Sequence, residues 1–193
     1  IDEYSPYKSV CAFSGNYDLI DIDMLVGKGL VDWNFINSVY QGYYQADPRY
    51  ADYAKARSLK MIIFREAFSN FDPKHDQAYK DFKKENAFWL DDFAKYMALK
   101  EANDEKPYWE WPNPANKPNP DTIDFHCFLQ YLFFDQWHQL KKYANDRGIE
   151  IFGDMPIYVS RDSSDFYYNR DMFLTDEKGE PHQISGVPPD EFS

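Results

Sequence analysis

The sequence is poor in cysteine and in positive charge. Two cysteines occur in 193 residues, Cys11 and Cys127, and each stands alone. This spacing is typical neither of a disulfide framework nor of a metal site, so it favours a reducing compartment such as the cytoplasm. Lysine and arginine number 21 against 33 aspartate and glutamate residues, which gives a formal net charge of −12. Nucleic acids and anionic membranes attract concentrated positive charge, so we expect neither as a partner.

Long apolar runs and short cofactor motifs are also missing. No run of about 20 apolar residues is present, so the sequence predicts no membrane-spanning helix. No GxGxxG, P-loop or GxSxG pattern occurs, and the four histidines show no metal-ligand spacing. We therefore expect no cofactor and no metal. His126 and Cys127 fall in a helical pattern, which favours a packing role for both over ligation or reactivity.

Aromatic residues, by contrast, are abundant: 16 Tyr, 16 Phe and 5 Trp. So much apolar surface argues against disorder, and the length suffices for one sizeable domain or two small ones. Several aromatic residues lie in non-periodic segments, namely Tyr4, Tyr7, Tyr40, Tyr43, Tyr44, Trp109 and Trp111. Such rings suit the apolar faces of sugars, but packing against other protein surfaces gives the same composition.

The negative charge is concentrated at the two ends of the chain. Residues 1–46 carry a net charge of −4 and residues 151–193 carry −6, whereas residues 47–106 hold 12 acids and 12 bases. Residues 107–150 contribute the remaining −2. The balanced middle is typical of solvated helix faces. The acidic ends contain either carboxylates that bind hydroxyl groups or catalyse, or loops that are acidic only for solubility.

Hydrophobic periodicity predicts a largely helical first half. A short strand is expected over residues 19–22, followed by a helix over 24–28 that ends at Gly29. Asp47-Pro48 and Asp72-Pro73 resemble helix starts, because aspartate caps free amide groups and proline suits the first helical position. Three helices are expected over residues 47–103.

The second half begins with a loop over residues 104–120 that holds five prolines and two tryptophans. It should be extended, and its tryptophans should pack against the protein. A long, mostly buried helix is expected from Asp121 to Arg147, ended by Gly148, and then a strand over residues 149–152. Asp162-Ser163 can start a short helix. A hairpin is expected around residues 176–179, with strands at 173–175 and 182–184.

Asp154 is the strongest single candidate for a functional residue. It follows the expected strand at 149–152 and Gly153. In parallel α/β folds the carboxyl ends of strands face the ligand site. The alternative is that the Asp154 carboxylate fixes a loop backbone, and position alone does not separate the two roles.

Five blocks of the sequence, in order, resemble the amylomaltases, which are 4-α-glucanotransferases or disproportionating enzymes of glycoside hydrolase family 77 in the α-amylase clan. The blocks cover nearly the whole chain: Ser5–Tyr7 with Ala12–Asn16, Trp89–Ala94 with Met97–Lys100, Phe125–Phe133 with Gln136-Trp137, Gly148–Val159, and Gly186–Ser193 with Asp162-Ser163 and Gly179.

The resemblance implies an α/β fold, part of a (β/α)8 TIM barrel running from about the loop after strand 1 to strand 3, with a large helical insertion. The chain would be an amino-terminal fragment. Residues 1–22 would be a barrel loop and strand segment, and 23–120 the mainly helical insert with its Pro/Trp-rich loop. Residues 121–159 would be barrel helix 2 and strand 3, and 160–193 the start of the following insert.

The resemblance also implies the chemistry, which is retaining transfer of α-1,4-glucan segments through a covalent glucosyl-enzyme. The catalytic nucleophile and acid/base lie on later barrel strands in this family, so we assign no catalytic residue to this chain. Substrate-binding roles are implied for Asp154, for Ser5 and Tyr7, and for an acceptor-side loop with Asp190, Glu191 and Phe192. The expected partners are α-1,4-glucans, such as starch and maltooligosaccharides, and the remainder of the same enzyme.

A different class of function stays open from the sequence. The helical residues 47–120 could belong to a non-catalytic glucan-binding or interaction module that keeps the sugar-contacting loops. Such a module would bind glucans without transferring them.

Overall fold

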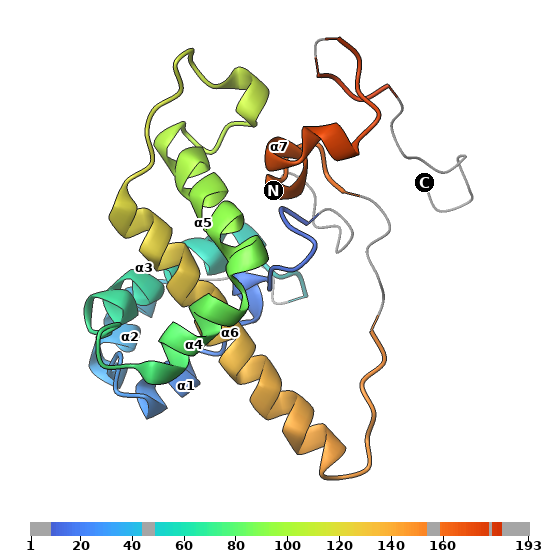
Figure 1. Ribbon diagram of the computed structural model, residues 1–193. Coiled ribbons are helices and arrows are strands. Elements are labelled where there is room, and N and C mark those ends of the chain that lie inside the picture. Colours follow the sequence, from blue (N-terminus) through green and yellow to red (C-terminus); the bar gives the residue numbers. More distant parts are fainter. Residues whose placement is uncertain (1–8, 44–48, 154–158, 178, 183–193) are drawn as a thin grey trace. The chain divides into compact units, whose positions relative to one another are not determined.

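The computed structural model describes residues 9–43, 49–153, 159–177 and 179–182 (Figure 1). These residues form helices joined by irregular segments, and they fall into two compact units. The first unit lies within residues 1–14, 88–123 and 152–193, and the second is formed by residues 15–87 and 124–151. The α-helices are α1 (Asp23–Gly27), α2 (Trp33–Tyr40), α3 (Tyr53–Ser69), α4 (Gln77–Glu85), α5 (Ala87–Ala102), α6 (Pro120–Asn145) and α7 (Ser164–Tyr168). The 3-10 helices are η1 (Tyr17–Leu19), η2 (Tyr108–Glu110) and η3 (Arg170–Met172).

The core of the second unit is formed by α6 together with α1, α2 and α3. Phe125, Phe128, Leu129 and Leu132 of α6 are completely buried. They cluster with buried residues from the other helices and their connections: Ile20, Leu25, Val31, Ile36, Ile63, Phe64 and Ala67. Burial of a large apolar side chain stabilises a fold by about 1.5–3 kcal/mol, so this cluster accounts for much of the stability of the unit.

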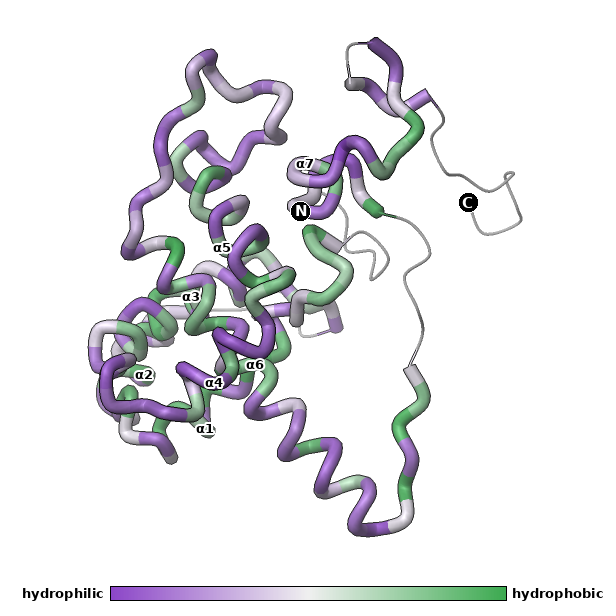
Figure 2. The backbone as a smooth tube through the Cα atoms, viewed as in Figure 1, coloured by the Kyte–Doolittle hydropathy of each residue, from purple (hydrophilic) through white to green (hydrophobic). Residues whose placement is uncertain are grey.

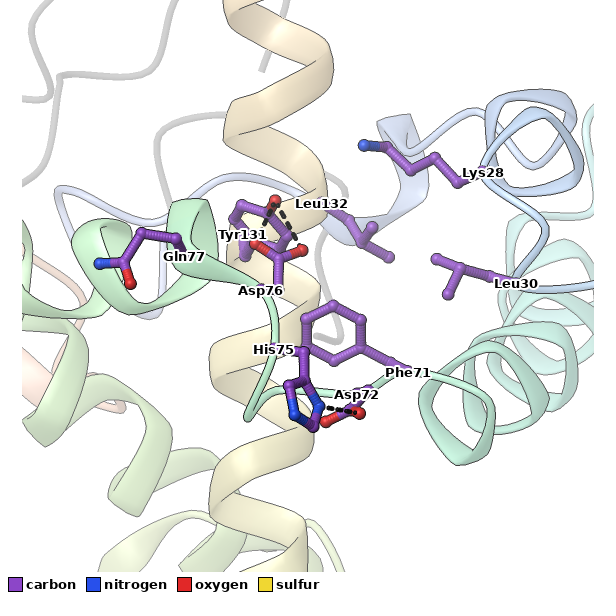
Figure 3. A pocket seen from close by; sticks show the side chains of 9 residues that line it. All are labelled: Lys28, Leu30, Phe71, Asp72, His75, Asp76, Gln77, Tyr131 and Leu132. Atoms are coloured by element: carbon purple, nitrogen blue, oxygen red, sulfur yellow. Dashed lines mark hydrogen bonds and ion pairs between the residues drawn. The ribbon is translucent and has the colours of Figure 1, made fainter.

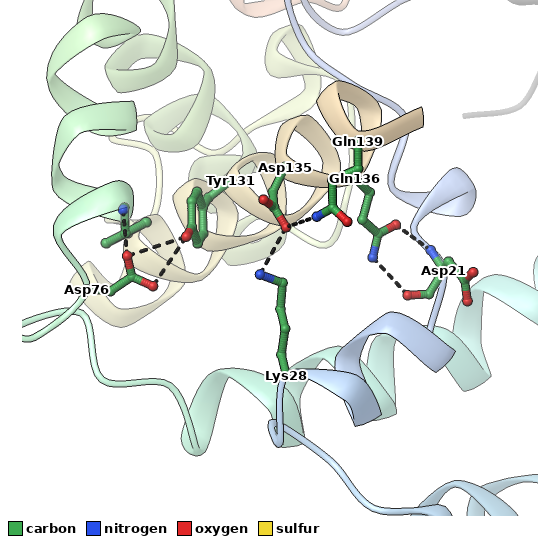
Figure 4. Close-up of polar contacts among 8 residues, drawn as sticks. Asp21, Lys28, Asp76, Tyr131, Asp135, Gln136 and Gln139 are labelled. Atoms are coloured by element: carbon green, nitrogen blue, oxygen red, sulfur yellow. Dashed lines mark hydrogen bonds and ion pairs between the residues drawn. The ribbon is translucent and has the colours of Figure 1, made fainter. Parts of the chain in front are cut away.

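Side-chain amides of α6 bind the backbone that precedes α1. Gln130, fully buried, accepts the Gly15 N–H at 2.8 Å and donates to the Gly15 carbonyl at 3.1 Å. Six residues further along α6, the Gln136 amide accepts the Asp21 N–H at 2.8 Å and donates to the Asp21 carbonyl at 2.9 Å (Figure 4). Each amide thus satisfies a backbone N–H and a backbone C=O that have no partner in a helix.

The first unit holds α7 and the irregular segments around it. Phe166 of α7 is buried, and its ring centroid lies 5.0 Å from that of Phe173 and 6.4 Å from that of Tyr108. Ser163 caps α7 by accepting the Phe166 N–H at 3.1 Å. This confirms the short helix expected after Asp162-Ser163, with the serine as the capping residue.

The expected helices are largely confirmed. Three helices occupy residues 53–102, and the long helix α6 runs from Pro120 to Asn145. The Asn119 side chain accepts the Asp121 N–H at 2.9 Å, so Pro120, not Asp121, is the first helical residue. Gly29 and Gly148 follow their helices with φ of +70° and +72°, the left-handed conformation expected of helix ends.

Two helix starts differ from the sequence-based expectation. Asp52, not Asp47, caps α3 by accepting the Lys55 N–H at 2.9 Å, and residues 47 and 48 lie outside the described residues. Asp76, not Asp72, caps α4 by accepting the Tyr79 N–H at 2.8 Å. In both cases the chain offers two aspartates a few residues apart, and the second precedes the apolar residues that the core requires.

The strands expected over residues 19–22 and 149–152 are not present. Leu19 closes η1, and α1 begins at Asp23. Residues 149–152 have no regular structure in the described part of the chain, although hydrophobic and hydrophilic residues alternate over 149–151 (Figure 2). A strand exists only through hydrogen bonds with a neighbouring strand, and no described segment pairs with either stretch. The (β/α)8 barrel expected from the resemblance is therefore not visible among the described residues.

The expected hairpin is present in part. An antiparallel bridge joins Thr175 and Pro181, and the His182 N–H donates to the Leu174 carbonyl at 2.9 Å. Gly179, with φ of +77°, allows the tight turn. The remainder of the second expected strand, residues 183 and 184, lies outside the described residues.

Candidate functional site

The six residues that the sequence predicts to contact substrate lie outside the described residues: Ser5, Tyr7, Asp154, Asp190, Glu191 and Phe192. Their roles stay predictions. The structure describes residues 9–16, which follow Tyr7 in the chain, and residues 159–177, which follow Asp154. These segments show how the chain beside the predicted contacts is held.

Residues 10–12 are hydrogen-bonded to α7, more than 150 positions away in the sequence. The Ser164 N–H and hydroxyl both donate to the Val10 carbonyl, at 2.8 and 3.2 Å. The Ala12 N–H donates to the Asp165 carboxylate at 2.7 Å. A charge-assisted hydrogen bond of this kind is roughly twice as strong as a neutral one. These hydrogen bonds fix the backbone at Val10, three residues after Tyr7. They also fix Ser164, which lies ten residues after Asp154.

Cys11 lies in this same junction and is 1% exposed. Burial, with a smaller contribution from the negative charge of Asp165, raises the pKa of the Cys11 thiol to about 11. A thiol that is protonated at neutral pH is a poor nucleophile. Cys127 is also buried, as expected of a small core residue. Neither cysteine is suited to nucleophilic catalysis.

Asp162 joins α5 to the start of α7. Its carboxylate accepts a hydrogen bond from the Tyr96 hydroxyl and another from the Lys100 ammonium group, both at 2.5 Å. Tyr96 is completely buried, and burial together with the Asp162 charge raises the pKa of its hydroxyl. Lys100 is only 8% exposed. The sequence indicates Asp162 only as a helix start, and its long-range pairing with Lys100 has no local signal.

The Pro/Trp-rich loop packs against the protein, as expected. The Trp111 ring centroid lies 5.8 Å from that of Tyr96 and 5.6 Å from that of Tyr167, and its indole N–H donates to the Lys106 carbonyl at 2.8 Å. The Arg161 guanidinium lies over the Trp109 ring, 4.0 Å from its centroid. For these two tryptophans the contacts seen are with the protein itself.

His126 is a core residue, as the helical pattern predicts. It is 1% exposed, and its Nδ1 atom lies 2.9 Å from the Tyr17 hydroxyl oxygen. Among the described residues, no three His, Cys, Asp or Glu side chains gather into a set that could hold a metal ion. None of the helices in the described part of the chain has the length and hydropathy needed to cross a membrane.

Comparisons with known proteins extend over the whole chain. The family model described as 4-alpha-glucanotransferase, glycoside hydrolase family 77, matches residues 1–193. A 4-alpha-glucanotransferase of Streptococcus pneumoniae is 41% identical over 98% of this chain and 39% of its own length. The 4-alpha-glucanotransferase of Thermus thermophilus is 37% identical, again over 98% of this chain and 39% of its own.

A solved structure agrees with these sequence matches. The amylomaltase from Streptococcus agalactiae in complex with acarbose is similar to 98% of this chain, with a TM-score of 0.83 and 35% identity. The match covers 40% of that amylomaltase, so the chain spans about two fifths of the length of the relatives it matches. A family model that matches every residue, together with relatives above 30% identity, places this chain in the 4-alpha-glucanotransferase family, glycoside hydrolase family 77.

Proposed function

We propose that this chain is part of an enzyme that transfers α-1,4-glucan segments to the 4-hydroxyl of an acceptor glucan or glucose. The observation that carries the proposal is the family match over residues 1–193. Relatives named 4-alpha-glucanotransferase at 35–41% identity support it, as does the related amylomaltase solved with acarbose. Because the chain spans about two fifths of those relatives, the activity belongs to the whole protein.

The proposed reaction is a retaining transfer. One carboxylate attacks the anomeric carbon of the donor glucan, and a second carboxyl group protonates the leaving glycosidic oxygen. The covalent glucosyl-enzyme is then resolved by an acceptor 4-hydroxyl in place of water, with the second group acting as base. We assign neither carboxyl group to this chain, and we expect both on later strands of a (β/α)8 barrel.

The contribution of this chain is proposed to be substrate binding. Asp154, Ser5 and Tyr7 would contact the bound glucan, and Asp190, Glu191 and Phe192 would belong to a loop on the acceptor side. The anchoring of Val10 and Ala12 to α7 supports this assignment, because a sugar subsite requires a backbone held in a fixed position.

The division of the chain follows the same proposal. Residues 1–22 would belong to a barrel loop, and 23–120 to the helical insert. Residues 121–159 are barrel helix 2 and strand 3, and 160–193 the start of the next insert. The exposure of Ile149 and Ile151 supports a strand at this position, because both apolar side chains could be covered by neighbouring strands and helices of a barrel.

The test is incubation of the purified full-length protein with maltotriose. Two maltotriose molecules should give one glucose and one maltopentaose, measured by chromatography of the oligosaccharides. The sum of glycosidic bonds should stay constant. Absence of any oligosaccharide longer than maltotriose would contradict the proposal, whether or not glucose and maltose appear.

A further inference from the structure

The cavity of about 480 Å³ in the second unit is lined by charged groups that already have partners (Figure 3). Lys28 Nζ lies 3.0 Å from the Asp135 carboxylate, and the two carboxylates of the lining contact His75 and the Tyr131 hydroxyl. The fold itself supplies these partners, so the charges of the cavity do not require a ligand.

In the first unit, two arginines contact segments that lie far apart in the sequence. Arg161 forms an ion pair with Glu180 of the hairpin, and its guanidinium carbon lies 4.0 Å from the centroid of the Trp109 ring. The guanidinium carbon of Arg170 lies 4.8 Å from the centroid of the Tyr108 ring. A guanidinium group is attracted to the face of an aromatic ring. The two arginines therefore join the Pro/Trp-rich loop to the segment around α7, and Arg161 also joins both to the hairpin.

The hairpin is held from within and from outside. The Asp176 N–H donates to the Glu180 carbonyl at 2.8 Å, and the Glu180 N–H donates to the Asp176 carboxylate at 2.8 Å. A Cβ atom added at Gly179 would lie 3.5 Å from Arg170 Nη1, so this arginine lies against the turn. The backbone of Glu180 is thus fixed by the hairpin, whereas its side chain connects the hairpin to Arg161.

The acceptor-side loop continues directly from this hairpin. Asp190, the first residue that we assign to the loop, follows His182 by eight positions. We propose that Arg161 and Glu180 are positioning residues for the acceptor, because their ion pair fixes the hairpin from which the acceptor-side loop extends. The two side chains act through the loop and do not contact the sugar. This inference rests on the proposed function, which assigns the loop to the acceptor.

The test compares two substitutions in the full-length protein that make the same change of charge on the same turn. Glu180→Arg places a second guanidinium group beside Arg161, so attraction becomes repulsion. Glu177→Arg is the matched control, at an exposed position. The donor is α-maltosyl fluoride, whose leaving group is a fluoride ion and not a sugar on the acceptor side. The acceptor is 13C-labelled glucose, and its transfer product is labelled maltotriose.

The expected result is a loss on the acceptor side alone. The side chains of Arg161 and Glu180 are 36% and 44% exposed, so Glu180→Arg should lower kcat/KM for labelled glucose only about three- to tenfold. Its kcat/KM for α-maltosyl fluoride, measured by fluoride release, should equal that of the wild type, because donor cleavage precedes the attack by the acceptor. Glu177→Arg should match the wild type in both quantities.

The charge-swapped double variant Arg161→Glu/Glu180→Arg restores an ion pair of opposite direction. It should recover at least half of the lost kcat/KM for glucose, which a general defect in folding would not allow. Equal values for Glu180→Arg and Glu177→Arg would overturn the inference and leave the proposed function intact. A parallel fall of both kcat/KM values, or a double variant that recovers nothing, would also overturn it. A wild type that releases fluoride but transfers nothing to glucose would overturn the proposed transferase, and the positioning role with it.

Discussion

Among the glycines in the described part of the chain, Gly15 is the one with the least room for a side chain. A Cβ atom added there would lie 2.0 Å from Cδ1 of the Phe133 ring, far inside van der Waals contact. The backbone cannot move away freely, because the Gln130 amide holds both its N–H and its carbonyl. Glycine is therefore required at this position by packing and not by an unusual φ.

Replacement of Gly15 should consequently destabilise the protein. Gly15→Ala forces the Phe133 ring or the Gln130 hydrogen bonds to shift, and we expect a loss of about 1–3 kcal/mol in the free energy of unfolding. Denaturant titration of the full-length protein measures it. Gly27→Ala is the control, because nothing lies within 4 Å of its added Cβ and alanine favours the helix. Equal stability of the two variants would contradict this account.

Asp154 is the residue whose replacement tests the predicted substrate-binding site most directly. If its carboxylate binds sugar hydroxyls, Asp154→Asn in the full-length protein should lower kcat/KM for maltotriose roughly 10- to 100-fold, the effect of one lost hydrogen bond to a charged group. The thermal midpoint should not change. Glu150→Gln, an exposed neighbour in the same segment, should leave both quantities unaltered. Unchanged kinetics for Asp154→Asn would reduce this residue to a structural role.

At the scale of elements, Asp162 connects α5 with α7 through a charged pair that is mostly buried. Asp162→Asn would leave the Lys100 ammonium group, 8% exposed, without its carboxylate. Removal of one partner from a buried pair typically costs about 3–5 kcal/mol, and the 27% exposure of the Asp162 side chain lowers our expectation to about 2–3 kcal/mol.

The double variant Asp162→Asn/Lys100→Met provides the critical comparison. It removes the unpaired charge together with its partner, so it should recover at least half of the stability lost by Asp162→Asn alone. Thermal or denaturant unfolding of the full-length proteins measures both. A double variant less stable than the single one would show that Lys100 stabilises the fold by other contacts.

The elements also show what local sequence can predict. Helix α6 follows from its apolar spacing and from Gly148, because both signals are local. Helix α2 was not expected, although Asp32 caps it at 2.8 Å and Ile36 is its buried residue. An aspartate followed by apolar residues at helical spacing was the available signal. The expected strand over residues 149–152 is absent, because a strand requires a partner and a partner is not a property of the segment itself.

The sequence predicts which residues form the candidate site, but it does not predict how the backbone beside them is held. The sequence blocks that resemble amylomaltases predict which residues would contact sugar, and those residues lie outside the described ones. The contacts that hold the neighbouring backbone, from Ser164 to Val10 and from Asp165 to Ala12, join segments more than 150 residues apart. No periodicity or capping signal encodes such a pairing. Only the folded chain reveals it.

At the scale of the whole molecule, buried tyrosines predict a loss of stability in alkali. Burial, with a contribution from the Asp76 charge, raises the pKa of Tyr131 to about 12, and burial also raises the pKa of Tyr79 and of Tyr96. The ordinary value is 10.0. Their contribution is complete below pH 10, where both folded and unfolded states are protonated, and it is lost progressively as the pH rises toward 12.

The thermal midpoint of the full-length protein should thus fall between pH 10 and pH 12. Tyr131→Phe should show a shallower fall, because phenylalanine cannot ionise in the unfolded chain. Melting curves at half-unit pH intervals test both statements. A midpoint that is constant over this range, or the same slope in wild type and variant, would contradict them.

The whole protein is proposed to transfer a glucan segment to an acceptor hydroxyl group. The most direct measurement is incubation of the full-length enzyme with maltotriose and 13C-labelled glucose, followed by mass spectrometry of the oligosaccharides. We predict one labelled glucose at the reducing end of maltose and longer products, since free glucose acts as the acceptor. Hydrolysis of maltotriose with no label in any oligosaccharide would contradict the account.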